Sequence, residues 1–344
     1  MNSITNQKIL NTYELKCKII TPLFMGGAKF NSELRTQSIN GILRWWFRVA
    51  GGNIEDEKRL FGWASDQSNQ GLVRLFIKEI IPSNKKFSWD EFNKYQYTGF
   101  NYLGFSLKMQ KRNPLPEDTE FILRISFHPR ATEKDEKKFF ATLWLAFNLG
   151  NFGSRSRRGF GSIKITSINN YNINDLYGLS FNPTQNLKDW INQNLDKIKF
   201  LINGNPQRNI PYIFENFEIY NFKSDNSFYR LLNDFGYHYS NFRKGESLNR
   251  KIVFGLPIMS NRKYREYTEY RNLRRASTLF LKILEIPKNN YTLILILTKP
   301  NNKNNFIFHP KINSQKIEWD VLDKLPEYIS NKLRSDFKQN KIFP

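Results

Sequence analysis

The residues best suited to bind an anion lie in one glycine- and arginine-rich stretch, GNFGSRSRRGFG, at positions 150–161. Its glycines permit positive φ angles, and its arginines carry fixed charge and forked donors that match phosphate oxygens. Consecutive N–H groups and serine hydroxyls add further donors. We predict that this loop contacts a phosphate backbone; a turn with solvent-exposed arginines is the plainer alternative. The candidate residues are Gly153, Ser154, Arg155, Ser156, Arg157 and Arg158.

This loop lacks the pattern of the known nucleotide-phosphate motifs. No Gly-Lys-Ser/Thr sequence ends it, and the residues that follow predict a strand rather than a helix. A Walker A loop and a dinucleotide-binding fingerprint are therefore excluded.

A second arginine pair lies in SINGILRWWFRVAGG at residues 38–52, which predicts a helix with Ser38 as its N-cap. At roughly 100° per residue, Trp46 falls on the apolar side, whereas Arg44 and Arg48 form a basic ridge on the opposite side. One interpretation is a solvated helix face. The other is a ridge that faces RNA or a neighbouring subunit.

A third basic region lies between Phe242 and Ala276 and contains ten Lys or Arg residues but only three acidic residues. Interleaved tyrosines suit single-stranded nucleic acid, through backbone charge and base stacking. A loop that docks on an acidic protein has the same composition, so both interpretations stay open. The candidate RNA contacts in this region are Arg274 and Arg275.

Candidates for catalysis are few. None of the three histidines has a second ligand at metal-binding spacing, and the single cysteine, Cys17, excludes a cysteine-based zinc site. We predict no cofactor and no metal. His238, in the sequence YHYS, is the one candidate general base for RNA cleavage, although a histidine beside tyrosines is more often simply packed.

The composition of the 344-residue chain favours a nucleic-acid partner. Lys and Arg number 53 against 31 Asp and Glu, a net charge of +22, and each cation placed on a phosphate releases condensed counterions. Solubility or an acidic neighbouring subunit would also account for this charge. No apolar run of about 18 residues predicts a membrane span and no signal sequence is recognised, so we expect a cytoplasmic protein without a membrane partner.

Periodicity and caps predict an α+β scaffold. The first half has the order strand, helix, strand, strand, helix, strand, which is the ferredoxin-like βαββαβ arrangement. Residues 83–119 are expected to be irregular. The predicted strands are 13–23, 71–81, 119–129 and the end of 151–168, and the predicted helices are 38–50, 54–64 and 132–150, the last with Thr132 as N-cap.

We divide the chain into an N-terminal domain at 1–168, a connecting region at 169–210 and a degenerate second domain of the same type at 211–344. The predicted elements of the second domain are strands at 210–220, 274–286 and 290–300, a helix at 227–242, and a terminal helix at 317–340 that Pro326 interrupts.

Five motifs, in order along the chain, resemble a known family. They are TPLFMGGA (21–28), RTQSINGILRWWFRVAGG (35–52), GSRSRRGFGSI (153–163), FGLPI (254–258) and RRASTLFLKI (274–283). Together they are similar to the first Cmr subunit of type III-B CRISPR effector complexes, within the RAMP superfamily. Residues 83–119 and 169–210 carry no motif that aligns.

The resemblance implies two ferredoxin-like, RRM-like domains in tandem and a non-catalytic RNA-binding subunit of an antiviral ribonucleoprotein complex. Family members lie at the end that holds the 3′ end of the guide crRNA and help to capture target RNA, together with other Cmr subunits. The motif arginines correspond here to Arg44, Arg48, Arg155, Arg157 and Arg158. Two alternatives stay open: a metal-independent guide-RNA-processing endoribonuclease on the same scaffold, and a module that contacts only protein.

Overall fold

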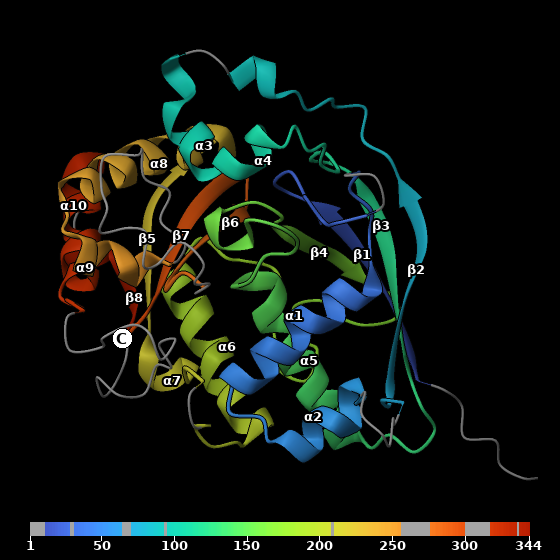
Figure 1. The fold of residues 1–344 in the computed structure, drawn as a ribbon. Helices are drawn as coiled ribbons and strands as arrows, with labels where there is room; N and C mark the ends of the chain where they lie inside the picture. Colours follow the sequence, from blue (N-terminus) through green and yellow to red (C-terminus); the bar gives the residue numbers. More distant parts are fainter. Residues whose placement is uncertain are drawn as a thin grey trace, which may run out of the picture.

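Two four-stranded antiparallel sheets form the framework of the chain in the computed structural model (Figure 1). The structure describes residues 11–27, 31–63, 70–92, 95–207, 210–255, 276–299, 317–335 and 337–344. The candidates Arg274 and Arg275 therefore lie outside the described residues.

Sheet 1 belongs to the N-terminal half and has the strand order β2-β3-β1-β4. The bounds of its elements are β1 (Thr12–Ile19), α1 (Thr36–Val49), α2 (Ile54–Phe61), β2 (Val73–Ile81), β3 (Glu120–Phe127), α5 (Glu133–Asn148) and β4 (Ile163–Ile168). The predicted ferredoxin-like order is confirmed for this half.

Sheet 2 has the strand order β6-β7-β5-β8, which repeats the order of sheet 1 strand for strand. The bounds of its elements are β5 (Phe217–Asp225), α8 (Phe228–Gly245), β6 (Leu279–Ile286), β7 (Asn290–Thr298), α10 (Val321–Leu333) and β8 (Lys341–Phe343). The predicted tandem arrangement is confirmed, and the second domain has the complete topology rather than a degenerate one. The sequence did not predict β8, which begins directly after the terminal helix predicted at 317–340.

Further helices, all short except the 16-residue α6, connect these elements. Their bounds are η2 (Trp89–Phe92), η3 (Tyr95–Tyr97), α3 (Thr98–Leu103), α4 (Phe105–Met109), η4 (Ser156–Arg158), α6 (Leu187–Ile202), α7 (Ile213–Asn216), α9 (Leu248–Lys251), η5 (Ile252–Phe254) and α11 (Phe337–Asn340). The expectation that 83–119 is irregular is wrong for α3 and α4. Helix α3 crosses α8 where Gly99 meets Gly236, and a Cβ on Gly99 would lie 1.9 Å from Asn233 O. Only glycine allows this close approach.

The sheets and helices stack as four layers, which follow one another from right to left in Figure 1: sheet 1, then α1 and α5, then sheet 2, then α8 and α10. One buried core lies between the two sheets and contains Trp46, Trp144 and Phe280. A second core lies between the other face of sheet 2 and its own helices and contains Leu232 and Leu281. Helices α1 and α5 therefore pack against both sheets and join the two domains.

The helix starts show which caps the sequence predicts well. Thr132 and Asp135 form the capping box predicted at the start of α5. The predicted N-cap Ser38 is wrong, because α1 begins at Thr36 after Arg35 and no side chain caps it. Apolar spacing predicts which residues are helical but does not place the first turn.

Two further boundaries in the second domain differ from the prediction. Pro326 does not interrupt a helix, because α10 runs continuously from Val321 to Leu333 with Pro326 in its second turn. The buried ring of Pro326 shows that packing there outweighs the loss of one backbone hydrogen bond. The strand predicted from residue 210 begins only at Phe217, because α7 precedes it.

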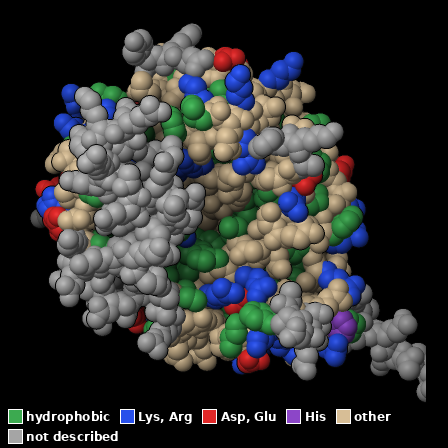
Figure 2. Space-filling model, viewed as in Figure 1, with side chains coloured by type: hydrophobic (Ala, Val, Ile, Leu, Met, Phe, Trp, Pro, Cys, Tyr) green, Lys and Arg blue, Asp and Glu red, His purple; other side chains and the backbone are tan. Residues whose placement is uncertain are grey.

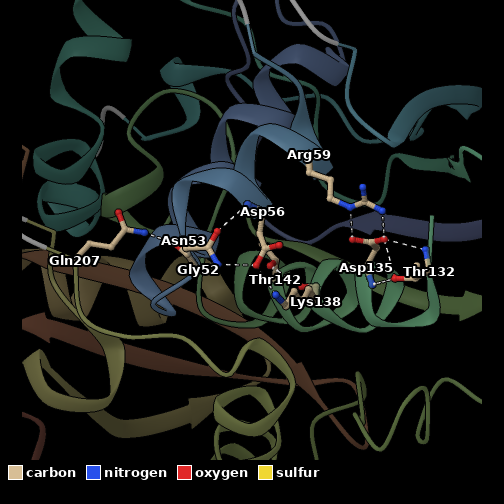
Figure 3. Close-up of polar contacts among 9 residues, drawn as sticks. All are labelled: Gly52, Asn53, Asp56, Arg59, Thr132, Asp135, Lys138, Thr142 and Gln207. Carbon is tan, nitrogen blue, oxygen red and sulfur yellow. Dashed lines mark hydrogen bonds and ion pairs between the residues drawn. The ribbon is translucent and has the colours of Figure 1, made fainter. Parts of the chain in front are cut away.

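Polar contacts hold α2 against α5 (Figure 3). Asp56 pairs with Lys138, and Arg59 pairs with Asp135 at 2.9 Å. These two ties fix the position of α2, and with it Glu57, beside α1.

Candidate nucleic-acid interface

The glycine- and arginine-rich loop follows α5 and folds back on the segment after β1. Gly153 has φ +79°, and a Cβ at this position would lie 2.7 Å from Phe24 O, so glycine is required. Ser154 N donates to the same carbonyl at 2.7 Å. Arg155 has φ 57°, a left-handed conformation that is uncommon for a residue with a side chain. Backbone geometry thus fixes the loop before any ligand binds.

Arg157 faces the second domain. Its Nη1 donates to Ser277 O, and its guanidinium carbon lies 4.2 Å from the ring centroid of Phe280 and 5.3 Å from that of Trp45. Trp45 in turn lies 5.5 Å from Phe280, beside the fully buried Trp46. The prediction that Trp46 is a core residue is confirmed. Arg157 is therefore part of the contact between the domains, a role that the sequence did not indicate.

Arg158 also contacts the second domain. It donates to the Tyr239 hydroxyl and to Phe254 O, each at 3.1 Å, and its guanidinium carbon lies 5.2 Å from the Tyr239 ring centroid. Both acceptors are neutral, so the charge of Arg158 is not cancelled by these contacts.

Arg155 lies near another cation of the loop, Arg158. Its Nε donates to Ser106 Oγ at 2.8 Å. Among the described residues, no carboxylate pairs with Arg155 or Arg158. Burial, followed by the guanidinium of Arg158 and that of Arg243, lowers the pKa of Arg155. The fold therefore holds like charges together, and a bound anion would offset their repulsion.

The remaining predicted loop residues stabilise the loop itself. Ser154 Oγ accepts a hydrogen bond from Arg112 Nη1 at 2.8 Å. The Ser156 carbonyl accepts one from Asn151 Nδ2 at 2.6 Å. Asn151 Nδ2 also donates to Leu281 O at 2.6 Å, which ties the loop to sheet 2.

Arg44 and Arg48 do lie together on one face of α1, but over a buried carboxylate. Glu57 is 0% exposed, and its oxygens accept Arg44 Nε at 2.8 Å and Arg48 Nε at 2.5 Å. Burial alone would raise the pKa of Glu57, but hydrogen bonds from Arg48 and Arg44 outweigh it and hold that pKa below its usual value. The interpretation of Arg44 and Arg48 as a freely solvated helix face is therefore wrong. One carboxylate compensates two guanidiniums, which leaves one net positive charge.

Sequence reasoning missed the aromatic neighbours of these arginines. The ring of Trp63 lies 5.6 Å from Arg44 and 5.3 Å from Lys58. Arg243 Nη1 donates to the Tyr102 hydroxyl at 2.8 Å, which brings α8 and α3 to the arginine cluster. The acids in IEDEKRLF could have indicated that a carboxylate such as Glu57 pairs with the nearby arginines. No sequence pattern could indicate the contact between Tyr102 and Arg243, because α3 and α8 are far apart in the chain.

Figure 2 shows how charge is arranged on the face that carries these elements. Hydrophobic side chains line a hollow near the centre of this face, and Lys and Arg side chains gather at its upper and lower borders. An apolar floor between basic borders suits a strand of nucleic acid, with bases on the floor and phosphates at the borders.

In the described part of the third basic region, one arginine, Arg250, is neutralised by carboxylates. Arg250 pairs with Glu246, Glu318 and Asp320 at 3.1, 3.0 and 2.8 Å. We therefore assign this residue to packing between α9 and the start of α10.

His238 lies on α8. Burial lowers the pKa of His238, Asp234 opposes this shift, and Lys332 of α10 adds to it. No described contact joins His238 to the glycine- and arginine-rich loop.

Within the described ranges, no group of three or more His, Cys, Asp or Glu residues is placed to hold a metal ion. The same ranges contain no helix long and apolar enough to cross a membrane.

Comparisons with known proteins agree with the geometry. The model of the RAMP superfamily matches residues 16–164, and the model of the Cmr1-like C-terminal domain matches residues 214–338. The CRISPR system Cmr subunit Cmr1-1 of Pyrococcus furiosus is 28% identical over 326 residues, which cover 88% of this chain and 89% of that protein. Subunit Cmr1-2 of the same organism is 33% identical over 173 residues, which cover 43% of this chain and 92% of that protein.

Solved structures show the same fold. The crystal structure of apo Cmr1 from Pyrococcus furiosus aligns with a TM-score of 0.66 and 23% identity, over 97% of this chain and 99% of that one. A chain in the cryo-EM structure of the type III-B Cmr-beta complex bound to cognate target RNA aligns with a TM-score of 0.59 and 17% identity, over 94% of this chain and 99% of that one. The chain belongs to the RAMP superfamily and, within it, to the Cmr1 family.

Proposed function

We propose that this chain is a non-catalytic, RNA-binding subunit of a type III-B Cmr ribonucleoprotein in the cytoplasm. In that complex it contacts guide crRNA and target RNA at the end that holds the guide 3′ end, beside other Cmr subunits, and serves antiviral defence. The Cmr subunits of Pyrococcus furiosus and the target-RNA-bound Cmr-beta complex support this assignment by similarity.

The observation that carries the proposal is the pair Arg155 and Arg158, which lie together without a described carboxylate partner. A protein that holds like charges together at a fixed loop gains free energy when a phosphate arrives. We assign Arg155 and Arg158 to phosphate contact. Arg44 and Arg48 form a weaker second border, because Glu57 cancels half of their charge.

Other predicted residues take supporting roles in this proposal. Arg157 positions the loop against sheet 2, and Gly153, Ser154 and Ser156 hold its conformation. We retain domain boundaries at 1–168, 169–210 and 211–344.

Arg155→Gly tests the proposal. Glycine adopts the left-handed conformation of residue 155 without strain and removes one guanidinium from the cluster, so the variant is expected to unfold at or above the wild-type temperature. Binding to labelled single-stranded RNA is expected to fall several-fold. The slope of log affinity against log salt is expected to decrease by about 0.7 to 1, which is one phosphate contact.

The matched control is Arg74→Ala, which removes one positive charge from an exposed strand on the opposite side of sheet 1. It should bind RNA almost as tightly as the wild type. A folded Arg155→Gly variant with wild-type affinity and salt slope would refute the assignment. RNA cleavage by the wild type that disappears in His238→Ala would instead support the endoribonuclease alternative.

A further inference from the structure

Helix α4 carries two large apolar side chains that the fold leaves exposed. Phe105 is 48% exposed and Met109 is 69% exposed, and they lie one turn apart on the same side of the helix. Leu107, between them in the sequence, is buried in the second core. Within the described ranges, no aromatic ring packs on Phe105. The helix is therefore attached by one face and presents an unoccupied ring on the other.

Contacts on both sides of Phe105 place it beside the glycine- and arginine-rich loop. Gly104, directly before it, lies so close to that loop that a Cβ on the glycine would be 3.0 Å from Phe160 Cζ. Ser106, directly after it, accepts the hydrogen bond from Arg155 Nε at 2.8 Å. Phe105 is thus one residue away from the side chain that holds Arg155.

The short helices that carry this ring are firmly anchored. Asn233 Oδ1 of α8 accepts hydrogen bonds from Gly99 N at 3.1 Å and from Phe100 N at 3.2 Å, at the start of α3. Beyond α4, Arg112 Nη1 donates to Ser154 Oγ of the loop at 2.8 Å. A ring that is held in place before a ligand arrives loses little further conformational entropy on binding.

The surroundings of the two exposed side chains are basic. Residues 95–116 include Lys108, Lys111 and Arg112 and no acidic residue. In the part of the chain that the structure describes, none of these three cations pairs with a carboxylate. Figure 2 shows hydrophobic and basic side chains next to each other over the region that Figure 1 labels α3 and α4. This charge attracts a polyanion to the exposed ring.

An exposed ring beside cations matches the two parts of a nucleotide. Proteins that bind single strands hold the phosphates with cations and stack the bases on aromatic side chains. The Met109 thioether can extend such a platform, because sulfur makes favourable contacts with aromatic rings. A docked protein would cover a much wider surface, about 800 Å² on each partner, whereas the exposed apolar surface of α4 consists of Phe105 and Met109.

We propose that Phe105, with Met109 beside it, stacks a base of the RNA strand whose phosphate Arg155 holds. This inference rests on the proposed function, because it requires RNA at the loop. The stacking contact involves no charge and accepts any base, since every base has a π face.

Phe105→Ala in the full chain tests the contact, with binding of single-stranded oligouridine measured across a salt series. The side chain is half-exposed, so the variant should fold, which thermal unfolding checks. We expect the affinity to fall about fivefold or more. The slope of log affinity against log salt should stay unchanged, because no phosphate contact is lost.

Two further variants and a second probe control this experiment. Phe105→Tyr keeps the ring and should bind like the wild type. Phe200→Ala removes a ring that is 75% exposed on α6, which packs on α5 and β8, and should also bind like the wild type. An abasic ribose–phosphate strand of the same length keeps the phosphates, so Phe105→Ala and the wild type should bind it equally.

The outcomes separate this inference from the proposed function. Wild-type affinity of Phe105→Ala for oligouridine overturns the stacking contact, and weak binding by Arg155→Gly would leave the proposed function standing. If neither variant loses affinity, the phosphate assignment is wrong as well. An equal loss on the oligouridine and abasic strands overturns the stacking contact, because the side chain would not touch a base.

Reconstitution from purified Cmr subunits and crRNA tests for a protein at the same place. Phe105→Ala should enter the complex like the wild type. A folded variant that keeps its RNA affinity but fails to enter the complex would show that a neighbouring subunit covers Phe105, which also overturns the proposal.

Discussion

Sheets 1 and 2 have the same strand order but different surroundings. In sheet 1, β1 and β3 alternate between buried and exposed residues, since only one face meets helices. In sheet 2, β6 and β7 are buried at nearly every position. One ferredoxin-like topology thus serves both as the outer layer of the molecule and as its central layer.

The central layer works because its two faces belong to different cores. Phe280 and Leu284 of β6 point toward α1 and α5, whereas Leu279, Leu281 and Ile283 point toward α8. A strand buried on both sides is a continuous apolar run. The β7 sequence TLILILT follows this pattern, and the β6 sequence LFLKILEI follows it except at Lys282 and Glu285. In this arrangement a polar residue on either face is removed from water, which costs free energy unless the residue is hydrogen-bonded.

Phe→Ala in equivalent strands tests this comparison most strongly. Phe280→Ala in β6 leaves a cavity among Trp45, Trp46 and Phe217, so the free energy of unfolding should fall by about 3–5 kcal/mol. Phe76→Ala in β2 removes a side chain that is 59% exposed and should change it by less than about 0.5 kcal/mol. Denaturant unfolding measures both, and equal losses would show that the two sheets are not differently buried.

The sequence predicted the topology of both domains because strands and helices leave local patterns. It predicted the cap at Thr132 for the same reason. It did not predict where Arg157 and Arg158 point, because their partners Ser277, Tyr239 and Phe254 come from the other domain. Local patterns contain no information about which domain packs on which loop. The apolar runs of β6 and β7 also indicated that both faces of these strands are buried. The sequence analysis predicted the strands from these runs but not the burial of both faces.

Buried charges extend the comparison. Glu57, between α1 and α2, is fully buried and has two arginine partners. Lys282, on the face of sheet 2 toward the first domain, is 1% exposed, and its Nζ donates to Gly150 O at 2.8 Å. Within the described part of the chain no carboxylate pairs with Lys282. The first charge should therefore stabilise the fold and the second should destabilise it.

Glu57→Gln should reduce the free energy of unfolding by about 2–3 kcal/mol at neutral pH, because two guanidiniums lose their shared carboxylate. The pKa of Glu57 is lowered in the folded chain, so its contribution is present above the unfolded pKa and is lost as pH falls through the folded pKa. The difference between wild type and variant should shrink under acid. Glu55→Gln, at a position 78% exposed in the same helix, is the control and should have little effect on stability. An unchanged stability in Glu57→Gln would show that the arginines do not depend on this carboxylate.

Lys282→Met should change stability in the opposite direction and by less, with a gain of about 1–2 kcal/mol at pH 7. Burial lowers the pKa of Lys282 to about 7, so the unfolded chain binds more protons than the folded one between that value and the ordinary lysine pKa. Wild-type stability should therefore rise with pH across this window, and the advantage of the methionine variant should decrease as it does. Lys16→Met on the open face of sheet 1 is the matched control, because Lys16 is exposed and its replacement should change stability little. The hydrogen bond to Gly150 O, two residues after the end of α5 at Asn148, favours the charged form through the helix dipole. If Lys282→Met proves less stable than the wild type at pH 7, the hydrogen bond to Gly150 O outweighs the cost of desolvating the ammonium. Lys282 would then stabilise the contact between the two domains rather than destabilise sheet 2.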